Sequence, residues 1–126
     1  MEPGRSIVGS VGYFLTEVIE LRDNDTIVVN APYTIFSRPF VYHTNHRVRC
    51  IGKKGKTNKF KIRGCSINGK DYFSHPEFEG DNADLPKNIG EGDILCFSDV
   101  GAYSPVMQMD FLHYNKAPTL LINQKQ

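Results

Sequence analysis

The sequence lacks the features that mark several large classes of protein. Its 126 residues carry a net charge of +1, with 15 lysines and arginines against 14 acidic residues. A balance so close to neutral argues against a dedicated nucleic-acid binder. No apolar run approaches the length needed to span a membrane, and the N-terminus does not have the layout of a signal peptide. We therefore expect a cytoplasmic protein with no membrane partner.

Cysteines are few, and no metal-binding spacing is present. Cys50, Cys65 and Cys96 are widely separated and form no CxxC pair, so the odd count predicts reduced thiols and no zinc signature. His43 and His46 would share one face of a helix, but on a strand their side chains point apart. Since no third ligand is adjacent, we predict no metal site.

What the chain does contain is an ordinary globular mixture, 40% hydrophobic and 23% charged. This length predicts one domain with a real core. Many short strands between turns indicate an all-β barrel or sandwich, although residues 14–22 fit a helical period about equally well. We expect a helical turn or two near Ser6, a loop or edge segment over 31–39 and a surface excursion over 71–90. The predicted strands are 14–22, 26–30, 48–51, 59–63, 94–97 and 119–122.

The stretch 92–104, GDILCFSDVGAYS, organises the rest of the chain. It begins with a turn pair, continues as a short apolar run typical of a buried strand, and ends in small residues before Tyr103. Gly101 lets the backbone come close to whatever Tyr103 faces. A strand that delivers these two residues to one point can place a site on a rigid element.

Two arginine motifs suit an anionic ligand. In EPGR at residues 2–5, Gly4 lets backbone N–H groups approach an anion that the Arg5 fork would bind, with Glu2 close enough to act on the same ligand. RPFVY at 38–42 places Arg38 near the Tyr42 hydroxyl, and both suit a carboxylate. The alternatives are a solvated N-terminal tail and a surface arginine before a turn proline.

Cys65 and a run of basic residues are open to two interpretations each. Cys65 follows a predicted strand in a loop, where an accessible thiol with a tuned pKa can act as a nucleophile or a proton donor. The alternative is an inert buried thiol, which is our interpretation of Cys50 and Cys96. The lysine-rich segment 53–63 could bind single-stranded nucleic acid with Phe60, or could simply be a solvated, lysine-protected edge.

Taken in order, EPGR, RPxxY, Gly-Cys and GDILxFxDxGAY resemble the C-terminal portion of the fold-type III pyridoxal 5′-phosphate-dependent decarboxylases, the ornithine and diaminopimelate decarboxylase family. The resemblance covers nearly all of residues 1–126, and RPxxY is more similar to the diaminopimelate branch. It implies a mainly β, Greek-key-like barrel similar to the C-terminal domain of alanine racemase. In the family this domain closes against an N-terminal (β/α)8 barrel that carries the Schiff-base lysine.

That (β/α)8 barrel is absent from these residues. The resemblance therefore implies a fragment, an expressed domain or one half of a split enzyme, which we expect to be inactive alone. It also implies contacts with pyridoxal 5′-phosphate, which would be held mainly by the missing barrel. Glu2 would face the pyridine nitrogen, Gly4 and Arg5 would lie at the cofactor phosphate or substrate carboxylate, and Tyr103 would reach the phosphate.

The resemblance assigns further residues to an amino-acid substrate. Arg38 and Tyr42 would hold its far carboxylate or polar end. Cys65 would enter the site of the neighbouring subunit in a head-to-tail homodimer and help to protonate the carbon left after CO2 loss. The family usually has an acidic residue directly after this cysteine, where this chain has Ser66. Asp71, further along the loop, could substitute; otherwise the departure at Ser66 leaves the substrate open, and a diamine-bearing amino acid other than diaminopimelate is the second expectation.

Two rival functions stay open at this point. A non-catalytic relative would bind a decarboxylase or another partner, but a pure binding module has no need of Glu2, Arg5, Cys65 and Tyr103 together. A nucleic-acid-binding β-barrel would use residues 53–63 and bind single strands in a strongly salt-dependent way. It would leave the remaining motifs unexplained, so we expect no nucleic-acid partner.

Overall fold

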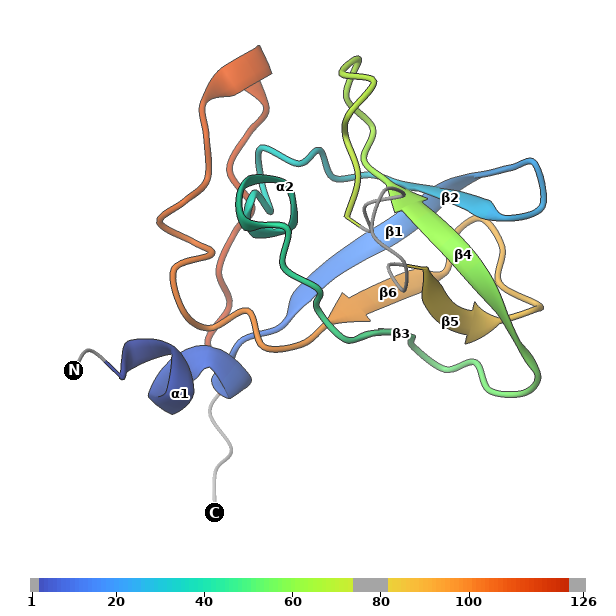
Figure 1. Ribbon diagram of the computed structural model, residues 1–126, viewed down its shortest axis with the longest axis horizontal. Coiled ribbons are helices and arrows are strands. Elements are labelled where there is room, and N and C mark those ends of the chain that lie inside the picture. Colours follow the sequence, from blue (N-terminus) through green and yellow to red (C-terminus); the bar gives the residue numbers. More distant parts are fainter. Residues whose placement is uncertain (1–2, 74–81, 123–126) are drawn as a thin grey trace.

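The structure, a computed structural model, describes residues 3–73 and 82–122 and is built mainly of strands (Figure 1). Six strands form one sheet in the order β3-β6-β1-β2-β4-β5. They are β1 (Phe14–Arg22), β2 (Thr26–Val29), β3 (Val48–Cys50), β4 (Thr57–Arg63), β5 (Ala83–Pro86) and β6 (Ile94–Phe97). The helical elements are α1 (Gly4–Val8), η1 (Gly9–Val11), α2 (Arg38–Tyr42) and η2 (Phe111–His113). The predicted barrel-like β fold with a short N-terminal helix is confirmed.

β1 is the central strand and the longest of the six. It pairs antiparallel with β2 on one side and with β6 on the other. The hairpin turn to β2 passes through Asp23 and Asn24, whose φ angles of 51° and 60° suit these residue types. Thr16 and Val18 are buried between exposed neighbours, which is the alternation of a strand with one buried face. The helical period that also fits residues 14–22 is therefore not the one adopted.

β2 and β4 run parallel in an otherwise antiparallel sheet. Parallel neighbours need a crossover connection, and here it runs from β2 through α2 and β3 to β4 (Figure 1). At the two ends of the strand order, β3 and β5 approach each other without sharing a ladder, so the sheet is nearly closed. The crossover carries the RPxxY motif from the sequence.

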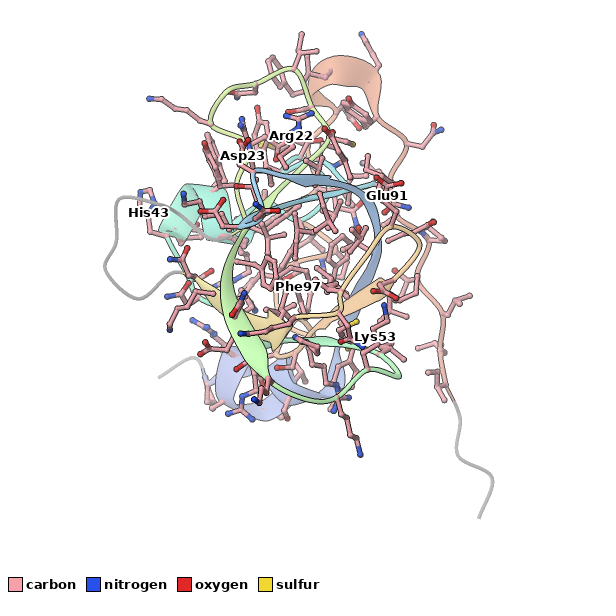
Figure 2. All side chains as sticks on the ribbon, turned by 90° about the vertical axis from the view of Figure 1, so that its right-hand side faces the viewer. Arg22, Asp23, His43, Lys53, Glu91 and Phe97 are labelled. Atoms are coloured by element: carbon pink, nitrogen blue, oxygen red, sulfur yellow. The ribbon has the colours of Figure 1, made fainter. Side chains whose placement is uncertain are left out.

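Aromatic rings fill the space that the sheet encloses. The Phe36 ring lies 4.9 Å from Phe14, 5.8 Å from Phe73 and 5.6 Å from Phe97, measured between centroids. Figure 2 shows Phe97 in the interior, whereas the labelled Lys53 lies at the periphery. Rings at these separations stabilise a core beyond the area that they bury. Because Phe36 belongs to the crossover, this packing fixes the start of α2.

Three sequence predictions about individual segments are wrong. Residues 71–90 are not simply a surface excursion, because Phe73 and Leu85 are buried and β5 pairs with β4; residues 74–81 of that prediction lie outside the described ones. Residues 119–122 form no strand, and their apolar side chains, such as Leu120 at 84%, are exposed. The loop predicted over 31–39 ends in α2, which starts at Arg38.

The basic segment does not present an uninterrupted positive surface. Three of its lysines make ion pairs: Lys53 with Asp93 at 2.6 Å, Lys59 with Asp84 at 3.5 Å and Lys61 with Asp25 at 3.2 Å. Such pairing mixes the two signs of charge along residues 53–61, which does not favour an electrostatic track for nucleic acid.

The described residues offer neither a membrane-spanning helix nor a metal site. No helix among them is both long and apolar enough to cross a bilayer. Within the same ranges, no three histidine, cysteine or acidic side chains gather where they could ligate a metal ion. The other predicted site residues within the described chain lie at two places. One is α2 with the neighbouring α1 and the segment after β6, and the other is the loop after β4.

Candidate functional site

Arg38 is a buried cation at the start of α2. Pro39 stands in the first turn, where its fixed φ favours helix, and the helix stops at His43 in the left-handed region. Only 8% of Arg38 is exposed. Its guanidinium carbon lies 5.4 Å from the ring centroid of Tyr42 and 5.9 Å from that of Tyr103. The guanidinium is therefore held between two aromatic faces that attract a positive charge.

The same guanidinium has no acidic partner among the described residues. Its interactions there are with the two rings, and neither an ion pair nor a hydrogen bond of Arg38 is found in residues 3–73 and 82–122. Its nitrogens keep some contact with solvent, because the fully buried side-chain N and O atoms without a partner among the described residues are Thr34 Oγ1 and Ser104 Oγ, but a cation so largely withdrawn from water gains from a bound anion. Its planar fork of N–H donors matches the oxygens of a phosphate or a carboxylate. These donors fit an anionic ligand such as a cofactor phosphate or an acidic substrate end.

The segment after β6 is clamped against the N-terminal helical turns. Val100 N–H donates to the Gly12 carbonyl at 3.0 Å, and Gly101 N–H donates to the Gly9 carbonyl at 2.9 Å. A β-carbon on Gly101 would collide with the Val8 carbonyl oxygen, so only glycine permits this approach of two backbones. The clamp fixes where the chain emerges toward Tyr103.

Tyr103 and the N-terminal motif meet beside Arg38. Tyr103 and Asp99 have φ angles of 65° and 62°, a left-handed conformation that costs roughly 1–3 kcal/mol each in residues other than glycine. Tyr103 is half exposed, and a β-carbon on Gly4 would lie 3.5 Å from its hydroxyl. Three predicted residues from distant parts of the sequence, Gly4, Arg38 and Tyr103, are thus brought together.

His46 belongs to the same neighbourhood, although sequence reasoning considered it only as a metal ligand. Burial chiefly lowers the pKa of its imidazole, and the nearby guanidiniums of Arg38 and Arg5 lower it further. The ring is therefore neutral at pH 7. Arg5 itself is exposed on α1, and its positive charge is among the causes that lower the pKa of His46. We call Gly4, Arg5, Arg38, Tyr42 and Tyr103 the arginine cluster.

A buried carboxylate organises the loop after β4. Asp71 is fully buried, and its two oxygens accept hydrogen bonds from Tyr33 N–H and Ser66 N–H, both at 2.9 Å. Gly64 N–H donates to the Asp71 carbonyl at 3.0 Å, and a β-carbon on Gly64 would strike the carboxylate. The expectation that Asp71 could contact a substrate is therefore not supported, because its oxygens hold the loop together.

Cys65 lies half-buried in that loop with a thiol that stays protonated. Burial first, and then the Asp71 carboxylate, raise the pKa of the thiol, while a hydrogen bond with the Tyr114 side chain opposes them. A neutral thiol suits a proton donor better than a thiolate nucleophile. Sequence reasoning missed Tyr114, since it lies in a segment with no recognisable motif. The Ser66 hydroxyl accepts from Asn68 N–H at 3.3 Å.

The predicted site residues therefore fall into two groups. Cys65 and Ser66 stand at the end of β4, while the arginine cluster lies around α1, α2 and the segment after β6. Figure 1 shows α1 and the loop after β4 at different ends of the view. α2 lies nearer to that loop, because Tyr33, whose N–H donates to Asp71, has its ring 4.4 Å from that of Phe40, although no contact between Cys65 and Arg38 is found among the described residues. Glu2, the remaining predicted residue, lies outside the described residues.

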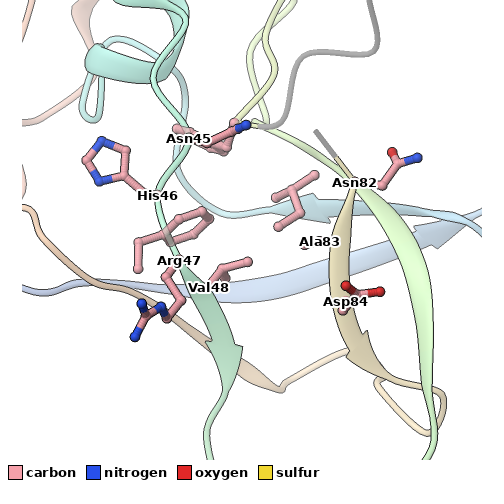
Figure 3. A pocket seen from close by; sticks show the side chains of 10 residues that line it. Asn45, His46, Arg47, Val48, Asn82, Ala83 and Asp84 are labelled. Atoms are coloured by element: carbon pink, nitrogen blue, oxygen red, sulfur yellow. The ribbon is translucent and has the colours of Figure 1, made fainter. Parts of the chain in front are cut away.

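A cavity of about 410 Å³ lies between β3 and β5, where the sheet is not closed (Figure 3). Its floor is apolar and its rim is polar, with Asn45, Asn82 and Asp84 among the lining residues. His46 also borders it, but Figure 3 shows the imidazole on the other side of the chain from Asn82 and Asp84. None of the residues in the arginine cluster lines this cavity.

Known proteins resemble this chain over most of its length. The family model for the C-terminal sheet domain of pyridoxal-dependent decarboxylases matches residues 7–101. A diaminopimelate decarboxylase of Helicobacter pylori strain J99 is 35% identical over 123 residues, which make up 95% of this chain and 28% of that protein. The chain therefore spans little more than a quarter of the length of that relative.

Solved structures agree on the fold. The Helicobacter pylori diaminopimelate decarboxylase complexed with L-lysine matches with a TM-score of 0.72 at 29% identity, over 85% of this chain and 25% of that one. Another crystal structure of a diaminopimelate decarboxylase reaches a TM-score of 0.84 over 98% of this chain and 31% of its own, at 24% identity. The six-stranded sheet is thus a known architecture.

Proposed function

Because the chain belongs to the pyridoxal-dependent decarboxylases and forms the C-terminal sheet domain of that family, we propose that it completes the active site of an amino-acid decarboxylase similar to the diaminopimelate decarboxylases. The rest of the site comes from a (β/α)8 barrel, as a domain or as a separate chain. The observation that carries this proposal is the buried Arg38 guanidinium, whose N–H donors have no acceptor among the described residues.

The arginine cluster supplies the contacts that an anionic cofactor needs. Pyridoxal phosphate, when bound, provides an electron-withdrawing ring that stabilises negative charge on the substrate α-carbon. Gly4, Arg5 and Tyr103 contact its phosphate in this proposal, and Glu2 faces the pyridine nitrogen. The convergence of Gly4 and Tyr103 at the edge of the cluster supports these assignments.

Substrate recognition falls to α2. Arg38 and Tyr42 hold the far carboxylate or polar end of the amino acid, since a guanidinium next to a phenol offers directed donors. Ser66 brings no charge to the position where the family usually has an acidic residue. We therefore propose that this chain recognises the distal end of its substrate through Arg38 rather than through a carboxylate of the Cys65 loop.

Cys65 acts in the site of the neighbouring subunit. Its protonated thiol delivers a proton to the substrate carbon after CO2 leaves, and the Tyr114 side chain positions it. This role requires the head-to-tail homodimer that the family resemblance implies, in which Cys65 of one subunit enters the site of the other. The absence of a contact between Cys65 and the arginine cluster among the described residues is compatible with a site shared between subunits.

Complementation tests the proposal. We would mix the chain with the (β/α)8 barrel portion of the Helicobacter pylori relative, add pyridoxal phosphate and measure CO2 release from diaminopimelate. Arg38→Met should reduce release by a factor of roughly 30 or more, because truncating one partner of a buried charge pair costs about 2–5 kcal/mol. The exposed Arg49→Met is the matched control and should leave release unchanged.

Two results would count against an enzymatic role. One is the absence of CO2 release although both parts are folded and form a complex. The other is a complex that shows no turnover and whose affinity is the same for Cys65→Ala as for the wild type. That second result would favour a regulatory binding domain instead.

A further inference from the structure

His46 occupies the junction between the segments that carry Arg38 and Tyr103. Its ring packs edge-on against Phe36, with 4.9 Å between centroids, two residues before Arg38. Its Nδ1 lies 3.0 Å from the Ser98 carbonyl oxygen, at the start of the segment that leads to Tyr103. One side chain therefore ties the crossover connection to the exit of β6.

The two ring nitrogens make different hydrogen bonds. A carbonyl oxygen can only accept, so Nδ1 carries the proton that is donated to Ser98. Nε2 then has a free lone pair, and it accepts from the Thr44 hydroxyl at 3.2 Å. This arrangement requires a neutral imidazole. Protonation of Nε2 would end its acceptance of the Thr44 hydroxyl and place a new positive charge in the cluster.

Charged groups from three segments influence the pKa of this ring. Arg5 comes from α1, Arg38 from α2 and Asp99 from the segment after β6. Burial lowers the pKa of His46 most and the two guanidiniums lower it further, while the hydrogen bond to Ser98 and the Asp99 carboxylate oppose them. The neutral form is therefore imposed partly by the same two cations that would bind an anion.

We propose that His46 is a positioning residue of the arginine cluster that couples anion binding there to the uptake of one proton. An anion held by Arg5 and Arg38 offsets their charge, so an imidazolium beside them becomes less costly. Conversely, a protonated His46 adds a third positive charge facing the anion. Linkage requires these two effects to be equal in free energy. The inference rests on the proposed function only in that the cluster binds an anion.

The test uses sulfate, which keeps its double charge between pH 5 and 8. We would follow the His46 ring protons by NMR during pH titrations of the full chain, with and without sulfate. Sulfate should raise the pKa of His46, and its affinity should increase roughly threefold to tenfold between pH 7.5 and pH 5.5, since one pKa unit corresponds to about tenfold in binding. A merely structural histidine would not show this coupled pair of changes.

Three variants sharpen the result. Arg38→Met should raise the pKa of His46 and abolish its response to sulfate, whereas the exposed Arg49→Met should change neither. His46→Asn keeps an amide donor for Ser98, so it should still bind sulfate at pH 7.5 but lose the increase at pH 5.5. The His46→Asn variant thus separates sulfate binding from the coupling of that binding to proton uptake.

The possible outcomes are distinct. If sulfate binds but leaves the pKa of His46 unmoved, or if His46→Asn keeps the pH dependence, the coupling is wrong and the proposed decarboxylase role is untouched. If no sulfate binds at either pH, the anion site and the coupling both fall. The complementation assay then decides separately whether the chain still supports CO2 release.

Discussion

The arginine cluster and the loop around Asp71 both contain a buried charge, but they differ in what surrounds it. The Asp71 carboxylate receives backbone N–H groups on both oxygens. The Arg38 guanidinium faces two rings and no acceptor within the described residues. A buried charge whose hydrogen bonds are satisfied stabilises the fold around it. A buried charge without such partners lowers the stability of the fold until a ligand binds to it. The contrast separates a structural anchor from a binding group.

Asp71→Ala should produce the largest effect on stability. It leaves the N–H groups of Tyr33 and Ser66 without their acceptor, which costs about 2–4 kcal/mol of unfolding free energy. Urea denaturation measures the loss. Asp71→Asn retains one acceptor oxygen and should fall between the wild type and Asp71→Ala. A change below about 0.5 kcal/mol in Asp71→Ala would mean that Asp71 is not an anchor.

Arg38→Met should behave in the opposite way. Removing an unpaired buried cation should leave the unfolding free energy unchanged or raise it by about 1 kcal/mol. Sulfate at ten times its dissociation constant should stabilise the wild type by about 1.4 kcal/mol, and this gain should vanish in Arg38→Met. Thermal unfolding with and without sulfate measures both quantities, with Arg49→Met as the control. If Arg38→Met and Asp71→Ala lost the same amount of unfolding free energy, the distinction between a binding group and a structural anchor would be wrong.

The smallest expected effect concerns the thiol next to Asp71. Tyr114→Phe removes the hydrogen bond that lowers the pKa of Cys65, so the thiolate fraction at pH 8 should fall and alkylation should slow a few-fold. Asp71→Asn removes a negative charge and should act in the opposite direction. Mass spectrometry of the Cys65 peptide gives the rates, and Tyr13→Phe, at an exposed tyrosine, is the control. An unchanged or faster rate in Tyr114→Phe contradicts the contact.

Much of the fold follows from local sequence, and the exceptions have physical causes. The strands over 14–22 and 94–97 have the predicted bounds, since β-branched residues and flanking turn pairs mark them. β5 escapes the pattern because it has only four residues and ends in Pro86, which usually argues against a strand. The parallel pairing of β2 with β4 cannot be predicted from the residues of either strand, because it depends on the long crossover between them.

The site shows a similar division. Motif resemblance selected Gly4, Arg38 and Tyr103, and the structure places them side by side; their contacts with cofactor and substrate stay predictions. His46 and Tyr114 could not be selected, because their chemistry depends on neighbours that are remote in sequence. Burial of Arg38 was equally invisible, since a proline after an arginine fits a surface turn as well.

The position of β1 has a consequence for how the chain assembles. One edge of β1 pairs with β2, which follows it across a tight turn. The other edge pairs with residues 94–97, which come much later in the sequence. Until β6 has been synthesised, that edge exposes unpaired backbone groups next to the apolar Leu15, which is a template for intermolecular strand pairing. The four-residue strand β6 therefore covers this edge only once the chain has been made as far as the segment that leads into Tyr103.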